Sequence, residues 1–192
     1  MRRLMMVTLL LCGLLLPRLH CQVKYEREYR VAATDFPENA QQFIAGCETK
    51  GKVKWLKEEH SEGYSWEAKF RKAGKHYSVE FDSLGQLQDV ETIVRQREID
   101  TAVWDAIHRA LEARLGTTKV IRLQEQWTGN AAMLQRAILA GTAQPGITTC
   151  FEVECTARDR KHFRAYEVLT DAKGAILLVR PIAAPNTQNL DY

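Results

Sequence analysis

The chain has 192 residues, of which 45% are hydrophobic, and it carries 27 lysines and arginines against 24 aspartates and glutamates. This length allows one domain of medium size or two small ones. Three of the arginines, Arg2, Arg3 and Arg18, lie in a segment that we expect to be removed, which leaves 24 basic and 24 acidic residues. A near-neutral chain lacks the basic excess of a nucleic-acid-binding protein, so that class of function is not expected.

Residues 1–21 have the pattern of a cleavable signal peptide. Arg2 and Arg3 precede an apolar run over residues 5–16, and this run is shorter than the roughly 20 residues that a bilayer-spanning helix needs. We therefore expect a periplasmic or secreted protein with no membrane span after cleavage. A lipid anchor at Cys21 is the less favoured alternative.

The first half of the mature chain predicts a helix followed by antiparallel strands. Phe36-Pro37 favours a helix start, because a proline in the first turn needs no N–H partner. Apolar residues then recur at helical spacing, at Ala40, Phe43, Ile44 and Cys47. After a short strand-like stretch at 25–33 and this helix, alternating apolar and polar residues predict strands over 52–59, 64–70, 77–81 and 87–94.

The same order of elements returns in the second half. Residues 99–115 predict a longer amphipathic helix that ends at Gly116. Strands are expected over residues 119–127, 150–156, 162–170 and 175–182. An insert at 128–147 contains a short helical stretch, and residues 185–192 form a polar tail that we expect to fray.

The match between the halves predicts an α+β fold of two tandem units, each a helix with a four-stranded antiparallel sheet. The first unit would span residues 22–97 and the second 98–184. Each half contains the same Asp-x-x-Gly turn before its last strand, Asp82–Gly85 in one and Asp171–Gly174 in the other.

The residues that repeat also carry a resemblance to a known family. They are Phe36-Pro37, Tyr77-x-Val79-x-Phe81-Asp82-x-x-Gly85, Tyr166-x-Val168 and Asp171-x-x-Gly174. With the signal peptide, this order resembles the PepSY-like or beta-lactamase-inhibitor-like (BLIP-like) exported proteins of the Bacteroidetes cell envelope. The insert at 128–147 departs from the simple repeat. The resemblance implies an exported binding or inhibitory module without chemistry of its own, and no functional residue is carried over.

Three cysteines remain after the signal segment: Cys47, Cys150 and Cys155. An odd number does not make a disulfide framework. Cys150 and Cys155 are five residues apart on one strand and so face opposite sides of it. Either Cys47 pairs with one of the other two, or all three are thiols.

No sequence pattern points to catalysis, a metal or a cofactor. Carboxylates surround a histidine in Glu58-Glu59-His60-Ser61-Glu62, but this stretch falls where a strand ends, so we expect a solvated turn. A thiol enzyme would need a base beside its cysteine, and although His108 and His162 are candidates for a base near Cys150, nothing in the sequence places either one there. No catalytic residue is predicted.

The exposed face of the sheet is the predicted binding surface. A helix covers one face of a strand layer, and the other face meets solvent or a partner. The polar positions on that other face are Glu67, Lys69, Ser78, Glu80, Glu152 and Glu154. Their mixed charge fits recognition of an envelope protein or enzyme, which the protein would inhibit or regulate. A pocket for a small ligand between helix and sheet is the alternative, and a Cys/His hydrolase the less favoured one.

Overall fold

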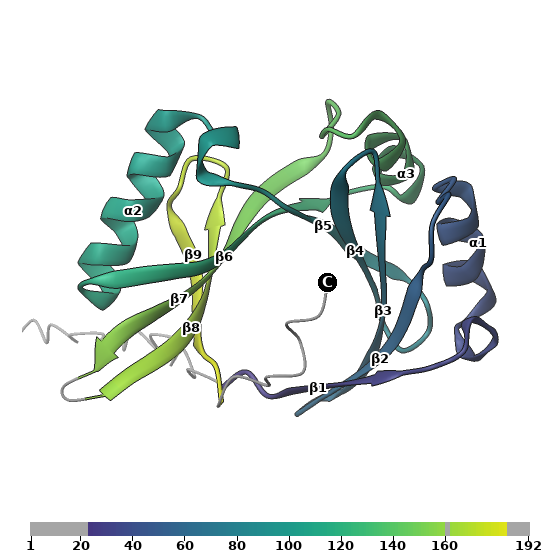
Figure 1. Cartoon of the computed structure of the whole chain (residues 1–192), viewed down its shortest axis with the longest axis horizontal. Helices are drawn as coiled ribbons and strands as arrows, with labels where there is room; N and C mark the ends of the chain where they lie inside the picture. Colours follow the sequence, from purple (N-terminus) through teal and green to yellow (C-terminus); the bar gives the residue numbers. More distant parts are fainter. Residues whose placement is uncertain (1–22, 160–161, 184–192) are drawn as a thin grey trace, which may run out of the picture.

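The computed structural model describes residues 23–159 and 162–183, which form one antiparallel sheet and three α-helices (Figure 1). The strands are β1 (Glu26–Arg30), β2 (Lys54–His60), β3 (Gly63–Lys72), β4 (Lys75–Phe81), β5 (Leu87–Ile93), β6 (Thr118–Thr128), β7 (Thr148–Asp159), β8 (His162–Asp171) and β9 (Ile176–Pro181). The helices are α1 (Glu38–Gly46), α2 (Thr101–Leu115) and α3 (Ala131–Ala140). The predicted α+β class is confirmed. The predicted signal segment 1–21 and tail 185–192 lie outside the described residues.

The nine strands lie in sequence order in a single sheet, each hydrogen-bonded to the next. Two separate four-stranded sheets were expected, but β5 pairs with β6 from Val90 opposite Trp127 to Ile93 opposite Gln124. Pairing of these two strands satisfies backbone groups that two separate sheet edges would leave open. The chain therefore forms one continuous sheet, and its division into two units stays a prediction.

The two Asp-x-x-Gly turns have the same hydrogen bonds. The Oδ1 atoms of Asp82 and Asp171 each accept from the amides two and four residues later, at 2.8 to 2.9 Å. Gly85 and Gly174 have φ of 78° and 85°, which L-residues rarely adopt. A Cβ at Gly85 would also lie 2.5 Å from Pro37 before α1, and one at Gly174 2.8 Å from a backbone nitrogen of α2. Each glycine thus allows a hairpin to approach a helix closely.

Helices cover only the outer, convex face of the sheet (Figure 1). One apolar core contains α1, α3 and the first strands, and its largest fully buried side chains are Tyr77, Phe81 and Trp127. A second core lies under α2 and includes Ile107 and Val153. The insert helix α3 packs into the first core, although the sequence places it in the second half.

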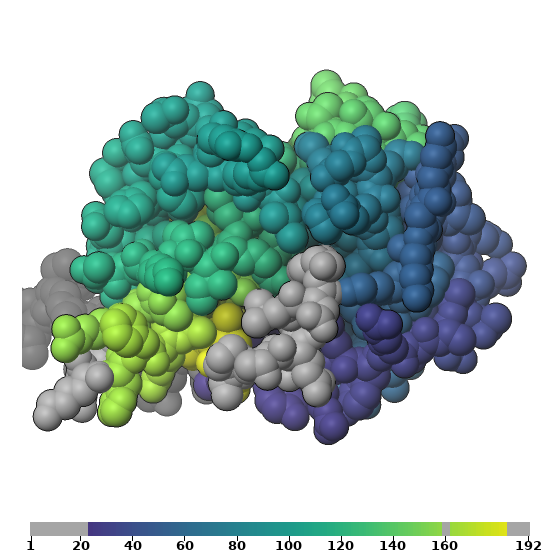
Figure 2. All heavy atoms as spheres, viewed as in Figure 1, coloured from purple at the N-terminus to yellow at the C-terminus, as the bar shows by residue number. Residues whose placement is uncertain are grey.

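The sheet is strongly curled, so that its first and last strands meet. The Lys24 amide donates to the Pro181 carbonyl at 2.9 Å, and the Ala183 amide donates to the Lys24 carbonyl at 3.0 Å. In Figure 2 the start of the described chain (purple) accordingly lies at the same lower edge as the last strand (yellow). The inner face of the strands therefore bounds a concave space. Among the described helices, none has the length and apolarity to cross a membrane.

The three cysteines in the described residues, Cys47, Cys150 and Cys155, are free thiols. A bridge from Cys47 to Cys150 or Cys155, left open by the sequence, is therefore ruled out. Cys47 is buried in the first core and Cys155 in the second, so these two thiols belong to separate apolar clusters.

Candidate binding site on the concave face

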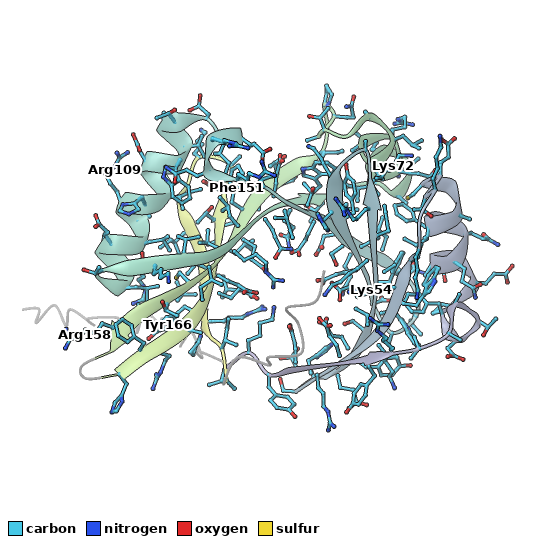
Figure 3. All side chains as sticks on the ribbon, viewed as in Figure 1. Lys54, Lys72, Arg109, Phe151, Arg158 and Tyr166 are labelled. Carbon is cyan, nitrogen blue, oxygen red and sulfur yellow. The ribbon has the colours of Figure 1, made fainter. Side chains whose placement is uncertain are left out.

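The structure brings all six predicted binding residues onto the concave face. Strand alternation places Glu67 and Lys69 of β3 opposite Glu80 and Ser78 of β4. The same alternation points Glu152 and Glu154 of β7 away from the apolar core that contains Phe151 and Val153. In Figure 3, Arg109 points outward from α2, and Phe151 lies on the side of the sheet that α2 covers. Convergence of the two halves on one concave surface thus follows from the alternation and the curl.

Three of these residues are buried, although the sequence predicts them on an exposed face, and the other three are half-buried. Glu67 is 4% exposed, Lys69 9% and Ser78 4%. Glu58, expected in a solvated turn, is 7% exposed and faces the same space. The curl folds the face onto itself, so the side chains bury one another. Their role in binding stays a prediction.

Further polar residues share this face and were missed from the sequence. They are Lys24, Glu26, Glu28, Asp89, Glu91, Gln124, Gln126, Glu167 and Arg180. Two of them could have been predicted from the sequence, because Asp89 and Glu91 alternate with the buried Val90 and Thr92 along β5. Nothing local marked Lys24, which reaches the site because the chain ends meet.

One acidic cluster on this face contains its own counter-charge. Single carboxylate oxygens of Glu28, Glu58 and Glu67 lie within 4.8 Å of one another. The ammonium of Lys69 lies 2.9 Å from Glu28 Oε1 and 2.9 Å from Glu67 Oε2. Ser78 Oγ donates to the other oxygen of Glu67. We call this the paired cluster.

A second cluster has no ion-paired lysine or arginine in the described part of the chain. Single oxygens of Glu80, Asp89 and Glu91 also lie within 4.8 Å of one another. Gln126 Nε2 donates to Asp89 Oδ2 at 3.4 Å and to Glu91 Oε1 at 3.3 Å, and Gln124 Nε2 donates to Glu91 Oε2. Within residues 23–159 and 162–183, no lysine or arginine forms an ion pair with these three carboxylates. We call this the unpaired cluster.

A cavity of about 440 Å³ lies between the unpaired cluster and the two ends of the sheet. Five carboxylates without an ion pair in the described residues line it: Glu58, Glu80, Asp89, Glu91 and Glu152. Among its described lining residues, Lys24 and Arg180 are the lysine and the arginine, and both contact Glu167. Exposed residues such as Tyr25 and Glu62 also line the cavity, which therefore opens to solvent.

Burial and crowding raise the pKa of these carboxyl groups. Burial, and then the negative charge of Glu67, raise the pKa of Asp89 to about 7. Burial, and then Glu167, raise the pKa of Glu152 to about 8. The pKa values of Glu80 and Glu91 are well above the ordinary value, first because of burial and then because of neighbouring carboxylates. Such groups bind a proton more readily near neutral pH because burial and neighbouring carboxylates outweigh the opposing charge of Lys24.

The same surroundings favour the charged form of Lys24, whereas they favour the neutral form of the carboxyl groups. Burial alone lowers the pKa of an ammonium group, but the charges of Glu152, Glu167 and Glu26 outweigh burial, and the pKa of Lys24 is raised. Its Nζ lies 3.0 Å from Glu26 Oε2 and also contacts Glu167. The interior of the curl therefore strongly favours a buried positive charge.

The Cys150/His162 pair does not come together, and the acidic cavity is not the helix–sheet pocket that the sequence left as an alternative. Cys150 lies opposite Asp171 and His162 opposite Asp159, at the two ends of the β7–β8 hairpin. Nine residues separate these positions on β7, a distance of about 30 Å at roughly 3.3 Å per residue. The pKa of the Cys150 thiol is raised by burial and by Asp171, which disfavours the nucleophilic thiolate. The acidic cavity, in turn, lies on the face of the sheet opposite the helices and not between helix and sheet.

No family model matches the chain, and no curated protein sequence matches it. Solved structures, in contrast, resemble the chain. A DUF2874 family protein from Bacteroides ovatus shares 16% identity, with a TM-score of 0.50 over 76% of this chain and 87% of that chain. A DUF2874 family protein from Bacteroides uniformis shares 19% identity, with a TM-score of 0.50 over 76% and 88%. A BLIP-like protein from Bacteroides fragilis shares 14% identity, with a TM-score of 0.48 over 82% and 92%. The structural neighbours of this chain are DUF2874 family proteins and a BLIP-like protein from Bacteroides, in agreement with the resemblance predicted from the sequence. At these identities the likeness shows the fold alone.

Proposed function

We propose that the protein is a non-enzymatic binding module that holds its partner on the concave face of the sheet. The observation that carries this proposal is the group of five buried or half-buried carboxylates, without an ion pair in the described residues, around a cavity of about 440 Å³. Burying a charge without a partner lowers stability. An arrangement that costs stability is expected where a ligand supplies the missing charge.

The curl limits the kind of partner. A broad flat protein surface could lie on an open sheet, but here the first and last strands are joined through Lys24. A partner therefore has to insert a protruding group into the concave space. An envelope protein with a projecting segment meets this requirement, as does a small molecule that fits the cavity.

The proposed location is the periplasm or the cell exterior, since residues 1–21 have the pattern of a signal peptide. Inhibition or regulation of an envelope enzyme is the proposed consequence of binding there. Both follow the sequence pattern and the resemblance to exported proteins.

The test is capture from an envelope extract with the chain from residue 22 onward as bait. A Glu152→Lys variant places a positive charge in the cavity wall, and an Arg109→Glu variant makes a change of similar size on the outer side of α2 (Figure 3). We expect the same partner to be recovered with the unaltered chain and with Arg109→Glu, but not with Glu152→Lys. Equal recovery with all three baits, or loss with Arg109→Glu alone, would contradict the concave face as the binding surface.

A further inference from the structure

The paired cluster contains an ammonium group, and in the described residues the unpaired cluster contains none. Each has three carboxylates within 4.8 Å of one another on the same concave face. In the paired cluster, Lys69 Nζ lies 2.9 Å from two of the three side chains. In the unpaired cluster, no described lysine or arginine takes the equivalent place.

We propose that the unpaired cluster of Glu80, Asp89 and Glu91 binds a primary ammonium group of a ligand. This inference rests on the proposed function and names the chemistry that the concave face recognises. The ligand ammonium would lie among the carboxylates of the unpaired cluster, as the Lys69 ammonium lies among those of the paired cluster.

The free acceptor atoms of the unpaired cluster match the donors of an ammonium group. The two glutamine amides already occupy both oxygens of Glu91 and Oδ2 of Asp89. Asp89 Oδ1 is buried and accepts no hydrogen bond in the described structure. No hydrogen bond to either oxygen of Glu80 is found among the described residues. Three open oxygens therefore remain, and a primary ammonium group has three N–H donors.

A divalent metal ion fits the same atoms less well. Calcium takes six to eight oxygen ligands at about 2.3 to 2.6 Å, and magnesium needs near-octahedral geometry. The amide N–H groups of Gln124 and Gln126 already donate to the carboxylates and bring no oxygen toward the cluster in these hydrogen bonds. The cavity of about 440 Å³ also exceeds the space that one ion fills. The geometry favours an organic cation.

The ammonium could come from a free small molecule or from a lysine side chain of a protein partner. The cavity opens to solvent beside exposed residues, including Gln88 next to Asp89. Lys24 and Arg180 lie elsewhere in its wall and would repel further positive charges. A ligand with one or two amino groups therefore suits the site better than a long polycation.

The experiment is calorimetric titration of the chain from residue 22 onward with three probes. One probe is 1,4-diaminobutane, which represents a free amine, and the second is Nα-acetyl-lysine amide, which represents a protein side chain. The third is the Nε-trimethyl form of that lysine derivative, which keeps the charge but has no N–H donor. We expect at least one of the first two to bind, and the trimethyl form to bind at least about tenfold more weakly, since the open oxygens then lose their hydrogen bonds.

Glu80→Gln and Asp89→Asn are the informative variants, because each removes a charge while keeping nearly the same shape. We expect each to weaken amine binding by at least about tenfold, and Glu112→Gln on the exposed side of α2 to leave it unchanged. Measurement of both variants keeps the test valid if one of them fails to fold.

Three results would overturn the ammonium site. They are binding of neither amine, unchanged binding in both Glu80→Gln and Asp89→Asn, and calcium binding that depends on Glu80 and displaces the amine. If capture from envelope extract still depends on Glu152 in any of these cases, the binding module stands and only the ammonium site is wrong. If amines bind as expected but no partner is captured, the ligand is a free amine and the protein-binding form of the proposed function fails.

Discussion

The two faces of the sheet differ in polarity, because the same strands place apolar side chains on the convex side and polar side chains on the concave side. On the convex side of β4, Tyr77, Val79 and Phe81 are at most 1% exposed and pack beneath the helices. On the concave side of the same strand, Ser78 and Glu80 face carboxylates. Burial of apolar area stabilises the convex side by roughly 25 cal/mol per Å², whereas burial of unpaired carboxylates on the concave side costs stability. Stability therefore resides on one face, and the other is available for binding.

The largest effect is expected in the convex core, and α3 offers a matched pair of leucines. Leu134 is fully buried and Leu139 is 41% exposed. We expect Leu134→Ala to lower the free energy of unfolding by about 3 kcal/mol, through lost burial and a residual cavity. Leu139→Ala should cost less than about 1 kcal/mol. Urea unfolding of both variants measures this, and equal losses would show that α3 does not close the first core.

The concave face should make the protein less stable as the pH rises. The folded-state pKa values of Asp89, at about 7, and Glu152, at about 8, lie above those of unfolded carboxyl groups. Between about pH 4 and pH 8 the folded chain therefore binds more protons than the unfolded chain, and the free energy of unfolding falls with rising pH. We expect a fall on the order of 2 kcal/mol, or about 5 °C in Tm, between pH 5 and pH 8.5.

Thermal unfolding across this pH range is the measurement. A flat or rising Tm would mean that these carboxyl groups find counter-charges that the described residues do not supply. An added ligand amine should reduce the slope, because it stabilises the ionised carboxylates.

Glu67 and Glu80 allow the paired and unpaired clusters to be compared directly, since they lie opposite each other on β3 and β4. Glu80→Gln removes a charge without an ion partner, and we expect it to stabilise the chain by about 1 kcal/mol near pH 8. Glu67→Gln removes a partner of Lys69 and an acceptor of Ser78, so it should destabilise by a similar or larger amount. The same sign of effect in both variants would refute the distinction between the paired and unpaired clusters.

The smallest effect is expected on the outer surface. His108 Nδ1 lies 3.8 Å from a carboxylate oxygen of Glu112 on α2, and both side chains are about half exposed. Glu112→Gln should change the free energy of unfolding by less than about 0.5 kcal/mol, because solvent screens exposed pairs. A larger change in urea unfolding would show that this exposed pair contributes to stability, and that Glu112→Gln is not a neutral control.

The sequence by itself determined the local elements and the side on which each residue lies. The alternation of Tyr77, Val79 and Phe81 predicts a strand with one apolar face, and the structure has it as β4. The spacing of Ala40, Ile44 and Cys47 predicts the buried stripe of α1. Strand and helix periodicities are properties of the chain over a few residues, so they are visible without long-range contacts.

Only the tertiary structure decided how those elements form the site. The pairing of β5 with β6 makes one sheet, the packing of Leu134 adds α3 to the first core, and the bonds of Lys24 to Pro181 and Ala183 join the ends. The last of these contacts links residues more than 150 positions apart, and no local pattern encodes such a separation. The curl that results from it turns an expected exposed face into the wall of an acidic cavity, in which five carboxylates of the described chain form no ion pair.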